Sequence, residues 1–275
     1  MENRKASKEG LERRHFLQGA ALMGVAGIAG GFQTLAGAER PPAPKIPDEG
    51  RLTPEESAYL KRWDTPTFAN AIERAKVRPH TDGFMNPSVR CIFPEFPMMV
   101  GYAVTATIKA SEPAASGAYV DRFEYYEYIQ SIPAPRIMVI HDLDAPKPIG
   151  SFWGEVHGSL HRALGCVGVV TDGGVRDLGP VRALRFHYFA AEVLVSHAHV
   201  HLVDFGKPVS VGGLTVNPGA LLCGDEHGVI EVPHALAKRL GPLCHEVYKA
   251  ERPVIDFYHS PDFSVEKLKE FLKKK

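Results

Sequence analysis

The sequence predicts an α/β protein: a compact three-layer α/β/α domain with a central mixed, partly parallel sheet and a β-rich C-terminal half. Three observations support this class. Strand-like and helix-like segments alternate between residues 98 and 171. The apolar run at 166–170 has the composition of a strand that is buried on both faces. Between 186 and 232, glycine-containing turns separate short β-rich segments, a pattern that is typical of hairpins.

Each element has its own sequence signal. Thr53 can cap a first helix, Pro54 suits its first position, and Glu56 completes a capping box. Apolar and polar residues alternate at 98–110, which indicates a strand. Helix-length segments separate the later strands, so β-α-β crossovers are expected. The further expected elements are helices at 68–75, 119–130, 153–164, 233–249 and 264–274, and strands at 136–141 and 166–171.

Size and composition exclude several classes of function. The 275 residues include 32 basic and 32 acidic residues, so no positive surplus exists to neutralise the phosphates of a nucleic acid. The four cysteines are widely spaced and form no Cys-x-x-Cys pair. This spacing excludes the usual thiolate zinc motifs and a dense disulfide framework.

Residues 1–38 read as a targeting segment. A polar, basic stretch ends in Arg13-Arg14 and is followed by Phe16-Leu17, an uncharged run at 19–32 and the small-x-small sequence Ala36-Gly37-Ala38. This order resembles a twin-arginine export signal. We therefore expect a periplasmic or secreted protein with no stable membrane insertion after signal removal. The alternative is an uncleaved anchor, for which the run is shorter than the roughly 20 apolar residues of a span.

After the signal, the chain divides into a proline-rich linker at 39–50, expected to be extended and mobile, and one domain at 51–275.

The first candidate site follows the buried strand, at the carboxyl end where open α/β sheets bind ligands. Two adjacent glycines permit a tight loop there. Asp172 and Asp177 offer hard oxygen ligands for Mg²⁺ or Mn²⁺. Arg176 offers a permanent charge and paired donors for a carboxylate or an enolate. The alternative is a surface turn in which the aspartates cap the backbone and Arg176 pairs with one of them.

The second candidate segment begins at Gly154. A helix that starts there exposes its first N–H groups, which can receive an anion. Glu155 adds a third carboxylate, although an acid in the first turn also favours the helix dipole without any other role.

The pairing of Trp153-Gly154-Glu155 with Gly165-Cys166-Val167-Gly168-Val169-Val170 and Thr171-Asp172-Gly173-Gly174-Val175-Arg176-Asp177 resembles the RraA-like family. That family includes the class II 4-hydroxy-4-methyl-2-oxoglutarate aldolases. Further matching stretches lie at 100–105, at Phe189, at 208–219 and at 225–229, so the resemblance covers roughly residues 65–260.

The resemblance implies a compact α/β/α fold that assembles as homotrimers or hexamers, with active sites at subunit contacts. It implies that Asp177 holds the divalent metal, partly through water, and that Arg176 contacts the keto oxygen of the substrate. The backbone of Gly154, Glu155, Val156 and His157 is then expected to receive the pyruvoyl carboxylate. Val156-His157 replaces the commoner Leu-Leu, so His157 changes the polarity of the pocket. An acid from a neighbouring subunit completes some family sites, and Glu246 and Glu251 are candidates.

The predicted function is a metal-dependent carbon–carbon lyase that cleaves a 4-hydroxy-2-keto acid to pyruvate and also decarboxylates oxaloacetate. The metal and Arg176 polarise the keto oxygen, and Glu155 and Asp172 order water at the metal. No lysine occurs between Lys147 and Lys207, which disfavours a Schiff-base mechanism.

The alternative is a non-catalytic binding protein, because the RraA-like family also includes inhibitors of an RNA-degrading enzyme. Export separates this chain from a cytoplasmic target of that kind. A second, separate metal site is conceivable if His197, His199 and His201 share one face of a strand, and a half-exposed polar strand face is the simpler interpretation.

Overall fold

The computed structural model describes residues 41–115 and 120–273. Its main sheet has the strand order β1-β6-β5-β3-β2-β10-β11, with β4 paired to β5 and β7 paired to β2. The strands of this sheet are β1 (Arg90–Cys91), β2 (Met99–Lys109), β3 (Arg136–Asp142), β4 (Ser151–Trp153), β5 (Cys166–Val175), β6 (His187–Val193), β7 (His201–Phe205), β10 (Leu221–Asp225) and β11 (Gly228–Val232). Pairs β2–β3, β3–β5, β4–β5 and β5–β6 are parallel, and the other pairs are antiparallel. The predicted mixed α/β class is confirmed.

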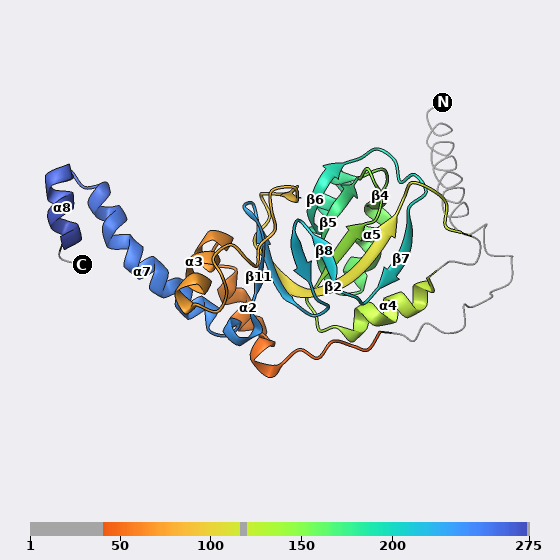
Figure 1. The fold of residues 1–275 in the computed structure, drawn as a ribbon, viewed down its shortest axis with the longest axis horizontal. Helices are drawn as coiled ribbons and strands as arrows, with labels where there is room; N and C mark the ends of the chain where they lie inside the picture. Colours follow the sequence, from red (N-terminus) through yellow and green to blue (C-terminus); the bar gives the residue numbers. More distant parts are fainter. Residues whose placement is uncertain (1–40, 116–119, 274–275) are drawn as a thin grey trace, which may run out of the picture. The chain divides into compact units, whose positions relative to one another are not determined.

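One face of the sheet carries the larger hydrophobic core. Val104, Met138 and Val169 point to this face from three adjacent strands. The helices that supply residues to this core are α2 (Pro54–Leu60), α3 (Thr65–Ala75), α4 (Arg122–Ser131), α6 (Leu178–Ala183) and α7 (Leu240–Tyr258). Leu164, just after α5 (Glu155–Ala163), packs against it. Figure 1 shows α4 and α5 beside the strands and α2 and α3 beside β11.

The opposite face is covered by a β-hairpin. Strands β8 (Val209–Val211) and β9 (Leu214–Val216) pair in antiparallel fashion, and their valines pack on Ala103, Val139 and Val170. The second covering layer of the described residues is thus a hairpin with the 85–89 segment, where the sequence led us to expect helices.

Helix starts follow the local sequence signals closely. Thr53 and Glu56 form the predicted capping box, with N···O distances of 2.8 and 3.2 Å. Helix α3 begins at Thr65, earlier than predicted, because two carboxylates bind its first turn. The Asp64 side chain accepts from the N–H of Thr67 at 2.9 Å, and Asp225 of β10 accepts from the Thr65 N–H at 2.7 Å.

The described part of the linker packs against the domain and does not extend freely. Ile46 is buried, and a short 3-10 helix, η1 (Asp48–Gly50), follows it. The Tyr102 hydroxyl donates to Gly50 O and accepts from the Leu52 N–H, both at 2.9 Å. The expected mobility of this segment is therefore wrong for residues 41–50.

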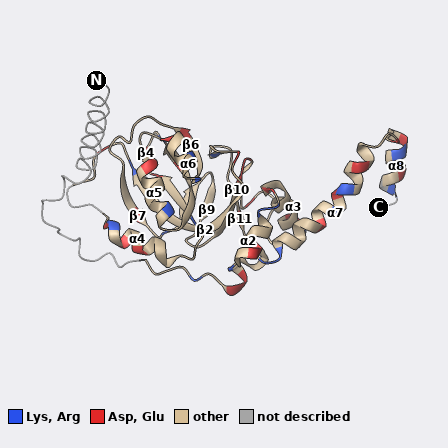
Figure 2. Cartoon of the chain, turned by 180° about the vertical axis from the view of Figure 1, so that it is seen from behind, with Lys and Arg blue, Asp and Glu red and all other residues tan. Residues whose placement is uncertain are grey.

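A second 3-10 helix, η2 (His234–Leu236), precedes α7, which begins and ends later than the helix predicted at 233–249. Helix α7 packs on α3 through Cys244 and Val247, and no later residue of α7 is buried. Helix α8 (Val265–Lys273) joins it through stacked rings of Phe257 and Phe271. Residues of both charge signs lie along both helices (Figure 2). Among the described residues, no helix is long and apolar enough to cross a membrane. The predicted export signal lies outside the described residues.

Candidate metal and keto-acid site

Asp177 joins the two segments that the sequence singled out. It follows β5, caps the start of α6, and has φ 56° and ψ 45°, in the left-handed region. Its Oδ2 accepts a hydrogen bond from the Glu155 N–H at 3.0 Å. Helix α5 has no side-chain cap from its own Gly154, so Asp177 supplies one from a distant part of the chain. A non-glycine residue in this conformation costs on the order of 1 kcal/mol, which is typical of constrained functional sites.

Position 154 has room for a glycine only. A Cβ at this position would lie 2.5 Å from Asp177 Oδ2 and 3.2 Å from Arg176 Nε. Any larger residue would therefore push the carboxylate and the guanidinium away from the helix start.

Arg176 is fixed at its backbone and accessible at its side chain. Its N–H donates to Trp153 O at 2.9 Å, and Trp153 is fully buried. Its Nε lies 3.8 Å from Asp177 Oδ2, and the two side chains are 34% and 38% exposed. The backbone of Arg176 is thus fixed by a buried residue, while the side chains of Arg176 and Asp177 remain accessible to a ligand.

The start of α5 is free to receive an anion. The Gly158 N–H bonds to Gly154 O at 2.8 Å, which is the first intrahelical bond, so the N–H groups of Val156 and His157 have no partner within the helix. Glu155 is exposed, and Val156 is 79% exposed. These donors lie beside the Arg176–Asp177 pair, so a carboxylate and a keto oxygen can be bound together.

The His157 side chain points inward. Its ring lies against Phe152, with the ring centroids 4.1 Å apart. Burial, and then the charge of Arg176, lower the pKa of His157 to about 4, so the imidazole is neutral at physiological pH. The predicted carboxylate contact concerns the backbone of His157, whereas its side chain packs inward on Phe152.

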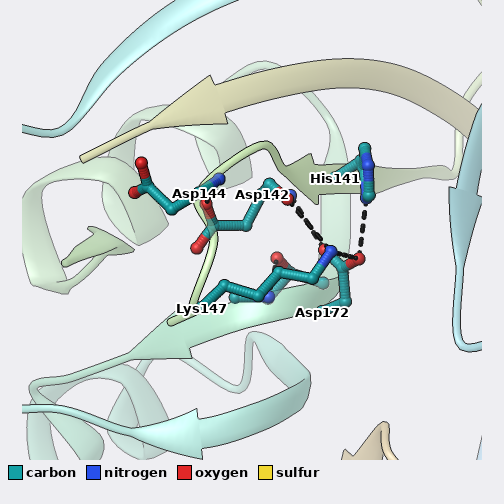
Figure 3. A network of polar contacts seen from close by, with 7 residues as sticks. His141, Asp142, Asp144, Lys147 and Asp172 are labelled. Carbon is teal, nitrogen blue, oxygen red and sulfur yellow. Dashed lines mark hydrogen bonds and ion pairs between the residues drawn. The ribbon is translucent and has the colours of Figure 1, made fainter. Parts of the chain in front are cut away.

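Asp172 belongs to a different network (Figure 3). Its Oδ2 lies 2.7 Å from His141 Nδ1 and 2.6 Å from Lys147 Nζ, and its Oδ1 accepts from the Asp142 N–H at 2.8 Å. No hydrogen bond joins it to Glu155, Arg176 or Asp177 within the described ranges. Its predicted role in ordering water at the metal therefore has no support in the geometry, and its contacts tie β5 to β3 and to the 143–150 loop.

The sequence interpretation missed Lys147. The lysine-free interval begins at this residue, yet the fold brings its ammonium group to Asp172, near the carboxyl end of β5. Its Nζ donates to both Asp172 Oδ2 and Asp142 O, so these contacts already occupy the amine that a Schiff-base mechanism would need free. The polar pair His141-Asp142 at the end of a predicted strand was the sequence feature that could have indicated this network.

Gly173 and Gly174 lie within β5 and do not form the predicted loop. A Cβ on Gly174 would meet the Leu194 side chain at 2.2 Å. The two glycines therefore serve the close approach of neighbouring segments. The predicted strand face of three imidazoles is also wrong, because only His201 lies in β7, and His197 and His199 precede it in a loop.

Two groups of carboxylates in the described residues are candidate binding sites for a divalent cation. Asp225, Glu226 and His227 have ligand atoms within 4.8 Å of one another. The Asp225 carboxylate is already engaged by Thr65 and by the His227 N–H, so this group is explained as a helix cap. Asp177 fits a metal better: it is half-exposed, offers hard oxygen atoms, and has the Glu155 carboxylate next to its bonded N–H. One or two carboxylates with water complete the usual Mg²⁺ site.

A mixed sheet whose central strands are parallel, with a helix start and an arginine–aspartate pair at their carboxyl end, defines an α/β protein. The chain belongs to the RraA-like family, because the family model described as Aldolase/RraA matches residues 60–231.

Known relatives agree with this assignment. A putative 4-hydroxy-4-methyl-2-oxoglutarate aldolase of Halalkalibacterium halodurans is 33% identical over 75 residues, which are 27% of this chain and 36% of the relative. The chain thus aligns with about a third of that protein.

Two solved structures share the fold. An uncharacterized protein from Pseudomonas syringae pv. tomato has a TM-score of 0.61 at 22% identity, over 80% of this chain and 95% of that chain. RraAS2 of Streptomyces coelicolor, described as an unusual member of the RNase ES inhibitor RraA protein family, has a TM-score of 0.58 at 18% identity, over 74% and 96%.

Proposed function

We propose that this protein is a divalent-metal-dependent carbon–carbon lyase that acts on 2-keto acids and releases pyruvate. The observation that carries the proposal is the meeting of three groups at one place: the free N–H groups of α5, the Arg176 guanidinium and the Asp177 carboxylate. A 2-keto acid has a carboxylate and a ketone on adjacent carbons, and these match the first two groups.

Each residue has a defined part. The N–H groups of Val156 and His157 bind the substrate carboxylate, and Arg176 binds the keto oxygen and stabilises the negative charge that develops there. Asp177, with Glu155, would hold Mg²⁺ or Mn²⁺. When bound, the metal acts as a Lewis acid on the keto oxygen. In a 4-hydroxy-2-keto acid, the C4 hydroxyl loses its proton and becomes a carbonyl as the C3–C4 bond breaks, and the C4 fragment leaves as a carbonyl compound. In oxaloacetate, the corresponding C3–C4 bond breaks with loss of CO₂. Both reactions leave the pyruvate enolate, which takes up a proton at C3 to give pyruvate.

The test measures pyruvate release from oxaloacetate and from a panel of branched 4-hydroxy-2-keto acids. We expect activity that EDTA abolishes and Mg²⁺ or Mn²⁺ restores. Arg176→Ala should lower kcat/KM by about 1000-fold, in the range seen for loss of a single oxyanion-stabilising donor. Arg162→Ala, in the last turn of the same helix α5, is the matched control and should be unaffected. Activity that resists EDTA or survives Arg176→Ala would refute the proposal.

A non-catalytic regulatory role is the second candidate, supported by the fold that this chain shares with RraAS2. It requires that purified protein bind no divalent metal and release no pyruvate. We further propose that the protein works as a homotrimer or hexamer outside the cytoplasm, after twin-arginine export. Light scattering on the purified protein and fractionation of cells that express a tagged chain test these two points. A monomer, or a tag confined to the cytoplasm when both arginines are intact, would contradict them.

A further inference from the structure

Three buried polar atoms around the Arg176–Asp177 site have no hydrogen-bond partner within the described residues. They are Trp153 Nε1, His157 Nδ1 and Tyr188 Oη. Proteins rarely leave such groups unpaired, because each costs desolvation energy with no return. Three such atoms, on β4, α5 and β6, indicate that polar partners such as ordered water bind there in the working protein.

Tyr188 lies beneath the site through a continuous set of rings. It is fully buried on β6, and its ring stacks on Phe93 with centroids 5.5 Å apart and an interplanar angle of 19°. Its edge meets Phe186 at 6.2 Å, and Phe186 stacks on Trp153 at 5.7 Å. Trp153 O in turn holds the Arg176 N–H. The ring of Tyr188 is therefore held in place by packing, and only its hydroxyl has no partner among the described residues.

The charges of the site act on this hydroxyl. Burial raises the pKa of Tyr188 well above its usual range, the Asp177 charge adds to the rise, and the Arg176 charge opposes it. The phenol is therefore a neutral O–H donor in a low-dielectric environment, where a hydrogen bond directed at an anion is strengthened. Asp177 follows Arg176, whose N–H is held by Trp153 O at the end of this set of rings, so its carboxylate is the anion of the site.

We propose that Tyr188 is a positioning residue of the metal and keto-acid site, whose hydroxyl donates a hydrogen bond through ordered water toward Asp177 and holds that carboxylate in its metal-binding orientation. This inference rests on the proposed function, because it assigns the divalent ion to Asp177. It adds a residue from β6 to a site otherwise built from β5 and the start of α5.

Tyr188→Phe tests the proposal, because it removes one oxygen and keeps the ring. Mn²⁺ affinity is measured by titration calorimetry, and the thermal midpoint is measured separately in EDTA. We expect Mn²⁺ to bind about tenfold more weakly, as is typical when a group behind a metal ligand is lost. The midpoint in EDTA should stay unchanged or rise by about 2 °C, because a buried hydroxyl without a protein partner has been removed.

Tyr128→Phe is the matched control. Tyr128 of α4 is also fully buried, but its ring packs on Phe205 and its hydroxyl interacts with Thr105 of β2. This variant should leave Mn²⁺ affinity unchanged.

Three results would overturn the inference. The first is unchanged Mn²⁺ affinity in Tyr188→Phe while wild-type protein binds the ion, which leaves the proposed function intact. The second is a lower midpoint in EDTA, which would make the hydroxyl structural. The third is a wild-type protein that binds no Mn²⁺, which removes the proposed function as well.

Discussion

The Asp177 carboxylate accepts a hydrogen bond from the backbone N–H of Glu155, 22 residues earlier in the chain, at 3.0 Å. This single contact joins the end of β5 to the start of α5. It leaves the remaining N–H groups of that helix start facing the same opening as Arg176. The contact between Asp177 and Glu155 depends on the space at Gly154, on the charge of the Asp177 carboxylate and on the left-handed backbone of Asp177. Substitutions can change the first two separately.

Gly154→Ala tests the space. The added Cβ would lie 2.5 Å from Asp177 Oδ2, so the carboxylate must move. We expect kcat/KM to fall by about 100-fold, as for a misplacement of about 1 Å at a site. Gly179→Ala, in α6, is the control, because a Cβ there meets nothing within 4 Å. That variant should be as active as wild type and slightly more stable. Equal effects of the two substitutions would contradict the proposed approach of Asp177 to α5.

Asp177→Asn tests the charge. Asparagine tolerates the left-handed backbone and keeps an oxygen for the Glu155 N–H, so the fold should hold with a thermal midpoint within about 3 °C of wild type. Loss of the carboxylate charge should weaken Mn²⁺ binding by at least about 100-fold. Titration calorimetry gives the affinity, and circular dichroism checks the fold. Wild-type affinity in a folded Asp177→Asn protein would place the metal elsewhere.

The Asp172 network should act as a cooperative unit. Asp172 is 12% exposed and bonds to both His141 and Lys147. Removal of the carboxylate leaves both donors without their acceptor, so Asp172→Ala should lower the free energy of unfolding by about 3 kcal/mol. Lys147→Ala should cost less because Lys147 is 33% exposed. Urea denaturation of both single variants and the double variant should reveal a coupling of about 1 kcal/mol. Strict additivity would mean that the ion pair contributes nothing.

Stability should decrease in mild acid. Burial lowers the pKa of His157 to about 4 and that of His161 to about 3. Burial is the main cause of the low pKa of His161, and the bond from its Nδ1 to His157 O opposes the shift. Its Nε2 lies 3.1 Å from the Tyr125 hydroxyl. The unfolded chain protonates both near the ordinary value of about 6.5. Below that pH the unfolded state binds more protons, so stability is lost as the pH falls from about 6.5 toward about 4.

Each of these two histidines contributes a slope of about 1.4 kcal/mol per pH unit in that window. Urea denaturation at pH 7, 6 and 5 measures the total slope. His161→Leu should reduce the slope even though it also lowers stability. A stability that is constant between pH 7 and pH 5 would contradict the burial of neutral imidazoles.

Local chemistry made much of the fold predictable. The Thr53–Glu56 capping box depends on residues three apart, and the apolar run of β5 on its own composition, so both were predicted from the sequence. The position of Asp177 beside Glu155 was expected only from the family resemblance, because spacing alone gives no distance between the two segments.

The remaining features depend on contacts between distant residues. The pairing of Gly174 with β4 and β6 extends β5 through residues that favour a loop. The ion pair of Lys147 with Asp172 joins residues 25 positions apart across a crossover. Tyr188 reads as an ordinary strand residue, and only its burial without a hydrogen-bond partner distinguishes it.

The Tyr102 hydroxyl, bonded to both Gly50 and Leu52, fixes where the chain enters the domain. Tyr102 pairs with Arg136 at the amino end of β3, whereas Arg176 and Asp177 follow the carboxyl end of β5. The amino end of the parallel strands thus binds the entering chain, and the carboxyl end holds the candidate site. A Tyr102→Phe substitution should therefore disturb the packing of Gly50 and Leu52 and leave the Arg176–Asp177 site unchanged.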